Sequence, residues 1–420
     1  MRRSLVGVML AVVLVGGAAG QDITSPQVLG LADVLRLALE KNPQLRAAKH
    51  GVKAADGRLL QAGAIPNPSL SAEVENFGGS GDAQGFDESE TTIGFEQTIE
   101  MGKRSARKNV AAAEVKLAER DREVCRLDLI METTGRFIDL LAAQEEMALS
   151  QEDWQTAQTI YQAVSNRVAA GKDSPLEEAK SRAELALARV GVEQAKSRIA
   201  VGRKALCALW AGSTSAMVLV RGDLAKAAHE IPEPAVLLEA MTRSPLWTRP
   251  ADELQAAESM VRAERRSRIP DLNIGAGIRQ SQADGSQAYV ASVGFELPLF
   301  DWKRGNIMAA EGELGRKRAE QEAAQTALST ELATVHELLV TTLGAVETLT
   351  RDALPAAEQA FAVAQASYAS GKTGYLDMQD ARRSLIDVRR QRLATLVDYH
   401  RAVAQVERLT GLGLSEIKQK

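Results

Sequence analysis

Apolar and polar residues alternate with a period of two in two separate parts of the chain. In the first part, Leu70, Ala72 and Val74 alternate with serine and glutamate, and a second alternating arm follows a polar, glycine-rich stretch. The same pattern returns about 200 residues later. It predicts two β-hairpins, over about residues 68–100 and 270–300, each with one apolar and one polar face.

A long helical run follows each hairpin. The first extends from Lys103 to Gly171 and the second from Lys303 to Gly371, so each would span about 100 Å as a single helix. Leu354–Pro355 predicts a kink in the second run. Apolar residues of that run also recur at alternating steps of four and three, which is the seam of a left-handed coiled coil. The seam consists of Leu328, Leu332, Val335, Leu339, Thr342, Val346 and Leu349.

Each long run ends at a glycine, the usual residue just past a helix C-terminus. From these turns, return helices are expected to reach Leu209 and Leu409, about 57 Å away. They are too short to cover the long partner. We therefore expect the helical segment that precedes each hairpin, which starts at Leu31 in the first copy, to stack end to end with the return helix.

The chain also repeats itself at a fixed spacing. Gly94–Phe95–Glu96 and Lys103–Arg104 recur 200 positions later as Gly294–Phe295–Glu296 and Lys303–Arg304. This duplicated strand-to-helix junction indicates two copies of one design. The expected domains are repeat 1 over residues 21–212 and repeat 2 over residues 235–414.

Three short segments flank the repeats. Residues 1–20 combine two arginines, an apolar run and small residues before Gln21, which is typical of a signal peptide. Residues 213–234 are expected to form an irregular connector, and residues 415–420 a short polar tail. After the signal peptide, no stretch of about 20 apolar residues is seen, so no transmembrane helix is expected.

Composition and motifs exclude several classes of function. The formal net charge of −4 gives no basic footprint for nucleic acid. Cys125 and Cys207 lie in helical patterns and are expected to be unpaired thiols. The four histidines have no metal-ligand spacing, and no Ser/His/Asp or Cys/His grouping is visible. We therefore expect no enzyme, and no catalytic, cofactor or metal site.

The hairpins pose a problem of closure. Four strands with an apolar face cannot span a bilayer as an open sheet, because the edge groups would be unpaired in hydrocarbon. Four strands are also too few to close a barrel, which needs about eight. The charged helices cannot enter the same bilayer. The sequence therefore predicts an oligomeric β-barrel in a bacterial outer membrane, continued by a long soluble helical part.

At this point the chain resembles the TolC family of outer-membrane efflux proteins. The resemblance rests on Leu31 and Asn42–Pro43, both hairpins, the Lys–Arg junctions, both glycine turns and Leu409–Thr410–Gly411. Three motifs are similar to the heavy-metal cation branch of CzcC-like proteins. They are Asn67–Pro68–Ser69–Leu70–Ser71, Glu75–Asn76, and the residues from Gln97 to Arg104.

The resemblance implies a mainly α protein with β structure that assembles as a homotrimer. Three chains would form a 12-stranded β-barrel in outer-membrane lipid and a periplasmic α-helical barrel. A periplasmic adaptor and an inner-membrane pump, commonly of the resistance–nodulation–division (RND) type, would be the partners. The protein would be the passive exit duct of a tripartite efflux system, with heavy-metal cations as cargo.

Two alternatives stay open. The same duct could serve drug efflux or type I protein secretion, because in this family the pump chooses the cargo. A soluble periplasmic coiled-coil adaptor or structural protein is the interpretation from a different class. Such adaptors have helical hairpins, but they do not carry two amphipathic β-hairpins at a fixed repeat.

The resemblance also implies a gate at the second glycine turn. Asp377 and Asp380 are three residues apart on one helix face and match the entrance aspartates of the family. Tyr368 matches a tyrosine that holds the entrance closed, and Glu177 stands where its acidic partner is expected, whereas Thr373 replaces the closing arginine. The alternative is that the aspartates only stabilise a helix N-terminus and Tyr368 only packs.

The turns and the junctions supply the remaining candidates. Lys172 and Lys372 lie beside Gly171 and Gly371, at the turns that the family uses to meet the adaptor. A solvated lysine near a helix C-terminus is the simpler interpretation, and both can hold. The junction pairs are expected at the inner boundary of the membrane. They are Lys103, Arg104, Lys303 and Arg304.

Overall fold

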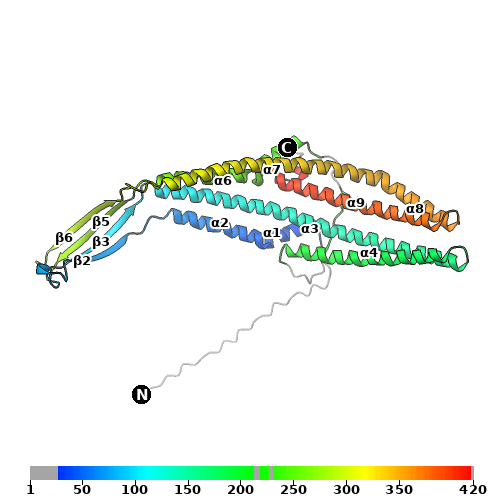
Figure 1. Cartoon of the computed structure of the whole chain (residues 1–420), viewed down its shortest axis with the longest axis horizontal. Helices are drawn as coiled ribbons and strands as arrows, with labels where there is room; N and C mark the ends of the chain where they lie inside the picture. Colours follow the sequence, from blue (N-terminus) through cyan, green and yellow to red (C-terminus); the bar gives the residue numbers. More distant parts are fainter. Residues whose placement is uncertain (1–26, 212–217, 227–230, 418–420) are drawn as a thin grey trace, which may run out of the picture.

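The computed structural model describes residues 27–211, 218–226 and 231–417. The expected signal peptide lies outside these residues. The molecule is elongated, with a β-sheet at one end, two helical turns at the other, and parallel rows of helices between them (Figure 1).

Four strands form one antiparallel sheet in the order β2-β3-β5-β6. They are β2 (Ser69–Glu75), β3 (Glu90–Ile99), β5 (Leu272–Ser281) and β6 (Gln287–Phe295). The register places Leu70, Phe95, Ala276 and Ala291 in one row across the sheet. Because side chains alternate between faces, most apolar residues of the four strands share one face; Val290, opposite Gly277, lies on the other. The predicted pair of amphipathic hairpins is confirmed.

Two helical hairpins form the opposite end of the molecule. The first is α3 (Lys103–Ala169) with α4 (Pro175–Ala208). The second is α7 (Arg304–Thr348), a π-helical turn (Leu349–Ala353) and α8 (Leu354–Ala369), followed by α9 (Tyr375–Thr410). Pro355 lacks an N–H, and its ring clashes with the preceding turn of an ideal helix. The wider π turn lies where the kink was predicted.

Shorter helices complete each row. They are α1 (Leu31–Lys41), α2 (Pro43–Ala62), α5 (Pro234–Thr242) and α6 (Pro245–Arg266). Helices α2 and α1 lie in line with α4, with α1 next to the C-terminal end of α4, and this row lies beside α3 (Figure 1). Asn42 joins the two pieces: its Oδ1 caps α2 by accepting from Leu45 N, while its Nδ2 donates to Leu209 O at 2.8 Å. The predicted end-to-end stacking is confirmed.

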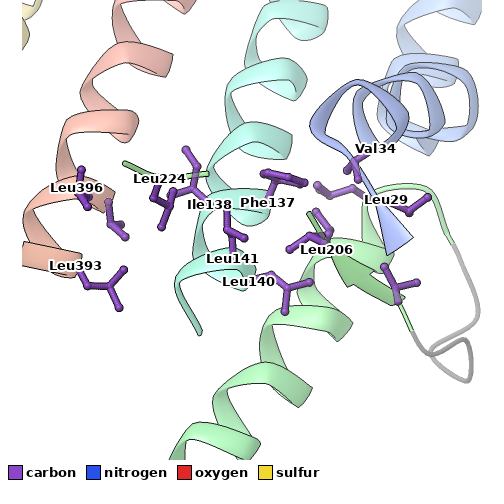
Figure 2. Packing of buried hydrophobic residues seen from close by; sticks show 14 of the residues in the cluster. Leu29, Val34, Phe137, Ile138, Leu140, Leu141, Leu206, Leu224, Leu393 and Leu396 are labelled. Atoms are coloured by element: carbon purple, nitrogen blue, oxygen red, sulfur yellow. The ribbon is translucent and has the colours of Figure 1, made fainter. Parts of the chain in front are cut away.

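The largest core lies where these rows meet. Phe137, Leu140 and Leu141 of α3 pack against Leu206 of α4 and Val34 of α1 (Figure 2). Two short parallel strands, β1 (Gln27–Leu29) and β4 (Val218–Val220), close this core from the side. The prediction of an irregular connector over 213–234 was therefore wrong for its described middle part.

A second core adjoins the first along α7 and α9. Leu332, Val335 and Leu339 of the predicted seam are buried in it together with Tyr399 and Val406 of α9. The chain end contributes α10 (Leu414–Ile417), whose apolar residues are buried here too. The expected polar tail over 415–420 is thus partly a core element, because Leu414 and Ile417 lie on one face of a helical turn.

The two strand-to-helix junctions differ more than the sequence repeat suggests. Strand β3 continues to Ile99, and α3 begins at Lys103 after Gly102, whose φ is 86°. Strand β6 ends at Phe295, and α7 begins only at Arg304 after Lys303. Ile99 is held by its partner in β5, whereas β6 is an edge strand with no partner beyond Phe295 among the described residues.

Two smaller expectations concern helix surfaces. Contrary to the sequence expectation, the run Arg304–Ala369 contains an 18-residue stretch apolar enough, by length and composition, to cross a membrane. Its seam residues pack inside the second core, so we assign the run to the helical bundle. Cys125 is half-buried and Cys207 buried, and both are free thiols, as expected.

The seam supplies a test of the bundle. Leu339→Ala removes a fully buried side chain and should lower the free energy of unfolding by about 2–5 kcal/mol. Leu338→Ala, one position away and 45% exposed, should cost less than about 1 kcal/mol. Urea unfolding followed by helical circular dichroism in detergent measures both. Equal losses would contradict the assigned seam.

Candidate functional site: the paired helical turns

The two turns at the far end of the bundle share one backbone geometry. Gly171 and Gly371 both have positive φ, 69° and 76°. In each turn the glycine N–H and the following lysine N–H donate back to carbonyls of the preceding helix, at 2.9–3.0 Å. This is the Schellman arrangement, in which glycine takes the left-handed position at least cost.

The side chains of the two turns are different. In the first, Arg167 forms a two-pronged ion pair with Asp173, at 2.7 and 2.9 Å. The Tyr368 hydroxyl, from α8 of the other hairpin, donates to the same carboxylate, and the Arg167 guanidinium lies 4.8 Å from the Tyr368 ring centre. The positions 200 residues later are Ser367 and Thr373, which carry no charge.

This cluster is charged at neutral pH. The hydrogen bond from Arg167 holds the pKa of the Asp173 carboxyl below its usual range. Burial, and then the hydrogen bond to Asp173, raise the pKa of Tyr368 well above that of an ordinary phenol. The tyrosine therefore remains a hydrogen-bond donor, and the three side chains join one hairpin to the other.

A layer of buried apolar side chains packs next to the Arg167–Asp173–Tyr368 cluster. Ile160 and Val164 of α3 are buried against Tyr368, Tyr375 and Met378 of α8 and α9. The two tyrosine rings pack edge to face, with centroids 6.4 Å apart. Because a tight apolar layer fixes the helices on either side, Tyr368 cannot leave Asp173 without disturbing this layer.

A buried arginine forms the next layer toward the middle of the bundle. The Arg382 side chain of α9 is 4% exposed and pairs with Asp153 of α3 and, at 3.7 Å, with Glu184 of α4. Gln379 Oε1 accepts from Arg382 at 3.1 Å, and Gln379 Nε2 donates to the Tyr375 hydroxyl at 2.6 Å. Three helices thus meet at one ionised group.

More arginine–carboxylate pairs continue this contact between α9 and α3 along their length. Their residue numbers rise along α9 as they fall along α3, as antiparallel helices require. The pairs are Arg382–Asp153, Arg389–Glu152, Arg390–Glu146, Arg401–Asp139 and Arg408–Asp128.

The structure separates the predicted gate residues. Asp377 and Asp380 are both exposed in the first turns of α9. Asp377 Oδ2 accepts from Gly374 N at 3.2 Å, so it also closes the start of the helix, as the simpler interpretation expects. Glu177 lies in the first turn of α4, but the hydroxyl of Tyr368 bonds to Asp173 instead.

Sequence reasoning missed Arg167 and Asp173. A signal was available: Arg167 is one turn before Gly171, and Asp173 lies in the turn two residues after it. A Schellman turn folds such positions back onto the helix end, which places the two charges side by side. The arginine that binds Tyr368 thus comes from the first turn and not from the position of Thr373.

The remaining candidates are the lysines at the turns and the basic pairs at the junctions. Lys172 and Lys372 are exposed at the two turns. At the first junction, Lys103 pairs with Asp271 at 2.9 Å, and Arg104 Nε donates to Gly63 O at 2.7 Å.

At the second junction, Lys303 pairs with Asp301 and Arg304 is exposed. Within the described residues, His, Cys, Asp and Glu side chains form no group of three or more that could hold a metal ion.

A family model described as outer membrane efflux protein matches residues 34–212 and 238–412, which is most of both repeats. The chain belongs to the outer membrane efflux protein family. The two matched segments correspond closely to the two repeats. This efflux protein is therefore placed in the outer membrane.

Curated relatives of the efflux protein agree with this family. The cobalt-zinc-cadmium resistance protein CzcC of Cupriavidus metallidurans is 32% identical over 384 residues, covering 91% of this chain and 90% of CzcC. The outer membrane protein OprJ of Pseudomonas aeruginosa is 23% identical, covering 89% and 83%.

Solved structures share the fold. The structure of CusC has a TM-score of 0.79 at 20% identity, covering 91% of this chain and 92% of that chain. VceC from Vibrio cholerae has a TM-score of 0.76 at 21% identity, covering 91% and 96%.

The Asp173 cluster predicts a pH-dependent contact between the hairpins. The pKa of Asp173 is lowered on folding, so its contribution is present above the pKa of an unfolded aspartate and is lost as pH falls below it. Asp173→Asn should weaken the turn by about 1–3 kcal/mol at pH 7, or roughly 5- to 150-fold in hydrogen exchange of nearby amides.

The difference from wild type should begin to shrink as pH falls through the usual pKa of an aspartate. It should vanish only where the folded-state carboxyl, whose pKa Arg167 lowers, is itself protonated. Thr373→Val is the matched control, because the Thr373 hydroxyl is buried without a hydrogen-bond partner among the described residues and should change exchange little. An Asp173→Asn effect of the same size at pH 3 and pH 7 would contradict the charged pair.

Proposed function

We propose that three copies of this chain form the outer-membrane exit duct of a tripartite efflux system for heavy-metal cations. The observation that carries the proposal is the open four-stranded sheet, which has one apolar face and two unpaired edges within the described residues. A membrane leaves no unpaired strand edge in contact with lipid, so the sheet must be completed by other copies. Three copies would supply twelve strands.

Exposure of the sheet supports the lipid contact. On the apolar face, Leu70, Ile93, Phe95, Ile278 and Val293 are each at least half exposed in the single chain. A soluble protein rarely leaves such a continuous apolar surface uncovered. This disfavours the soluble adaptor alternative, in which the strands would have to be covered by another protein.

Charge on the polar face supports a cationic cargo. The polar face carries Glu73, Glu75, Glu90 and Glu96, and Arg279 bonds to two of these carboxylates, Glu75 and Glu90. This face would line the interior of a closed barrel. An acidic lining attracts cations and repels anions. The name of CzcC, at 32% identity, favours cobalt, zinc and cadmium among the possible cations.

The paired turns would be the periplasmic entrance. Asp377 and Asp380 are exposed there, so three copies would gather six carboxylates around the opening. We infer that the Arg167–Asp173–Tyr368 cluster holds the entrance closed, because it ties the two hairpins together. Glu177 adds negative charge beside it.

The exposed turns also offer the adaptor contact. Lys172 and Lys372 follow the glycines at the end of the molecule farthest from the sheet, where a periplasmic adaptor can reach them. An RND-type pump would lie beyond the adaptor. Lys103, Arg104, Lys303 and Arg304 would mark the inner boundary of the membrane, because they lie where α3 and α7 begin after the strands.

The cargo can be tested by deletion in a strain that lacks redundant channels. Loss of the gene should lower tolerance to zinc, cobalt and cadmium, and the wild-type gene should restore it. Tolerance to organic drugs should change less. Unchanged metal tolerance with lower drug tolerance would favour the drug-efflux alternative, which the similarity to OprJ keeps open.

The entrance charges can be tested without breaking the helix start. Asp377→Asn with Asp380→Asn should lower the cation-over-anion permeability ratio in planar-bilayer recordings, while the amide oxygen introduced at position 377 can still accept from Gly374 N. Asp398→Asn, on α9 but far from the turn, is the matched control. An equal fall in the control would show that entrance position does not matter.

A further inference from the structure

We infer that β6 of one copy pairs with β2 of the next in one defined register, with Phe295 opposite Val74. This inference rests on the proposed trimeric barrel and adds to it the residues that close the barrel. It concerns the two strands that have a neighbour on one side only in the described sheet, β2 beside β3 and β6 beside β5.

The direction of the two edges permits this pairing. The sheet is an antiparallel series of four strands, so β2 and β6 run in opposite directions. If β6 of one copy lies next to β2 of the following copy, that junction is antiparallel as well. It then has the same form as the junction between β3 and β5 inside the chain.

The internal repeat fixes the register. Leu70 is opposite Phe95 in the first hairpin, and Leu272 is opposite Phe295 in the second. Strand β5 therefore repeats β2 with an offset of 202 residues, and β6 repeats β3 with an offset of 200. The two hairpins have one register.

The structure contains one junction between two such hairpins, in which Phe95 of β3 is opposite Ala276 of β5. Adding 200 to Phe95 gives its counterpart Phe295 in β6, and subtracting 202 from Ala276 gives its counterpart Val74 in β2. In an antiparallel pair one residue number rises as the other falls, so Leu297 lies opposite Ala72, and Leu299 lies opposite Leu70. If the six hairpins of a trimer meet in equivalent ways, these are the residues across each subunit boundary.

The residues in these pairs are all apolar, as expected for the apolar face of the sheet. In the sequence, Leu297 and Leu299 continue the alternation of β6. In the single chain they lie beyond its end, in a turn where Leu299 N donates to Leu297 O, and each is 64% exposed. Within the chain, no strand of the described sheet faces them, because β5 begins opposite Phe295. A second copy of β2 would give them the apolar neighbours that the sequence pattern calls for.

Pro298 is compatible with this register. A Cβ on Gly277 would come within 3.1 Å of the Gly94 Cα, the close approach of a non-hydrogen-bonded antiparallel pair. Pairs two residues along are of the same kind, so Thr98 opposite Asn273 is also non-hydrogen-bonded. Pro298 is the counterpart of Thr98, and its missing N–H would not be needed by β2.

One pair opposes the register. It sets Glu296 opposite Glu73 on the polar face, where like charges repel. The repulsion acts in the water-filled interior, where screening weakens it. The same register gives three apolar pairs on the lipid-facing side against this one repulsive pair. Without the pairing, the strand edges would be unpaired in hydrocarbon, which is more costly.

Cysteine cross-linking of the full chain in the outer membrane tests the register. In a background with Cys125→Ser and Cys207→Ala, Glu73→Cys with Glu296→Cys should form inter-chain disulfides under mild oxidation. Non-hydrogen-bonded pairs bring Cβ atoms close enough for such a bond. Dimers and trimers on non-reducing gels should form at least 10-fold faster than with Ser71→Cys/Glu296→Cys or Glu75→Cys/Glu296→Cys.

A second pair in the same register, Glu75→Cys with Gly294→Cys, covers the case in which the first variant does not insert. Thr98→Cys with Asn273→Cys is the positive control within one chain. Two outcomes would overturn the register alone. One is faster cross-linking of either shifted pair. The other is no cross-linking of both in-register pairs in a chain that is still trimeric in detergent. A chain that is monomeric and links only within itself would overturn the proposed trimer.

Discussion

The constraint on which the rest of the structure depends is the unpaired backbone of the two sheet edges. Every N–H and C=O in hydrocarbon must find a partner, and the described part of this chain supplies only four strands to the sheet. The consequence reaches beyond the membrane: if copies must surround a common axis at the sheet, the helical rows that leave each hairpin must surround the same axis. A duplicated chain meets this requirement economically, since two equivalent hairpins leave the sheet at equivalent positions.

The helical part depends on a different interaction, the contact between α9 and α3. This contact joins the second hairpin to the first. Exposed arginine–carboxylate pairs along it contribute at most about 1 kcal/mol each. Arg382 differs, because its side chain is 4% exposed, and removing one partner of such a buried pair costs about 3–5 kcal/mol. The hairpins are thus joined most firmly close to the turns, which is where a gate would have to separate them.

Much of this fold could be predicted from sequence because its patterns are long and regular. Strand periodicity, the coiled-coil seam and the 200-residue offset identified both hairpins and the seam that buries Leu332 and Leu339. The failures were short elements whose structure depends on distant partners. Val218–Val220 is a strand only because Gln27–Leu29 lies beside it, and Ile417 is buried only because the second core is near.

The two turns show why sequence repetition did not predict the site. Identical backbone geometry needs only glycine at one position, and both turns have it. The cluster that links the hairpins needs Arg167 and Asp173 in one turn and Tyr368 from the helix before the other. Repeating this contact would need a second arginine and a second aspartate at positions 367 and 373. The second copy carries Ser367 and Thr373 there, so one charged cluster remains between the hairpins. The duplicated backbone positions the turns, and the difference between the copies makes the connection that opening would have to break.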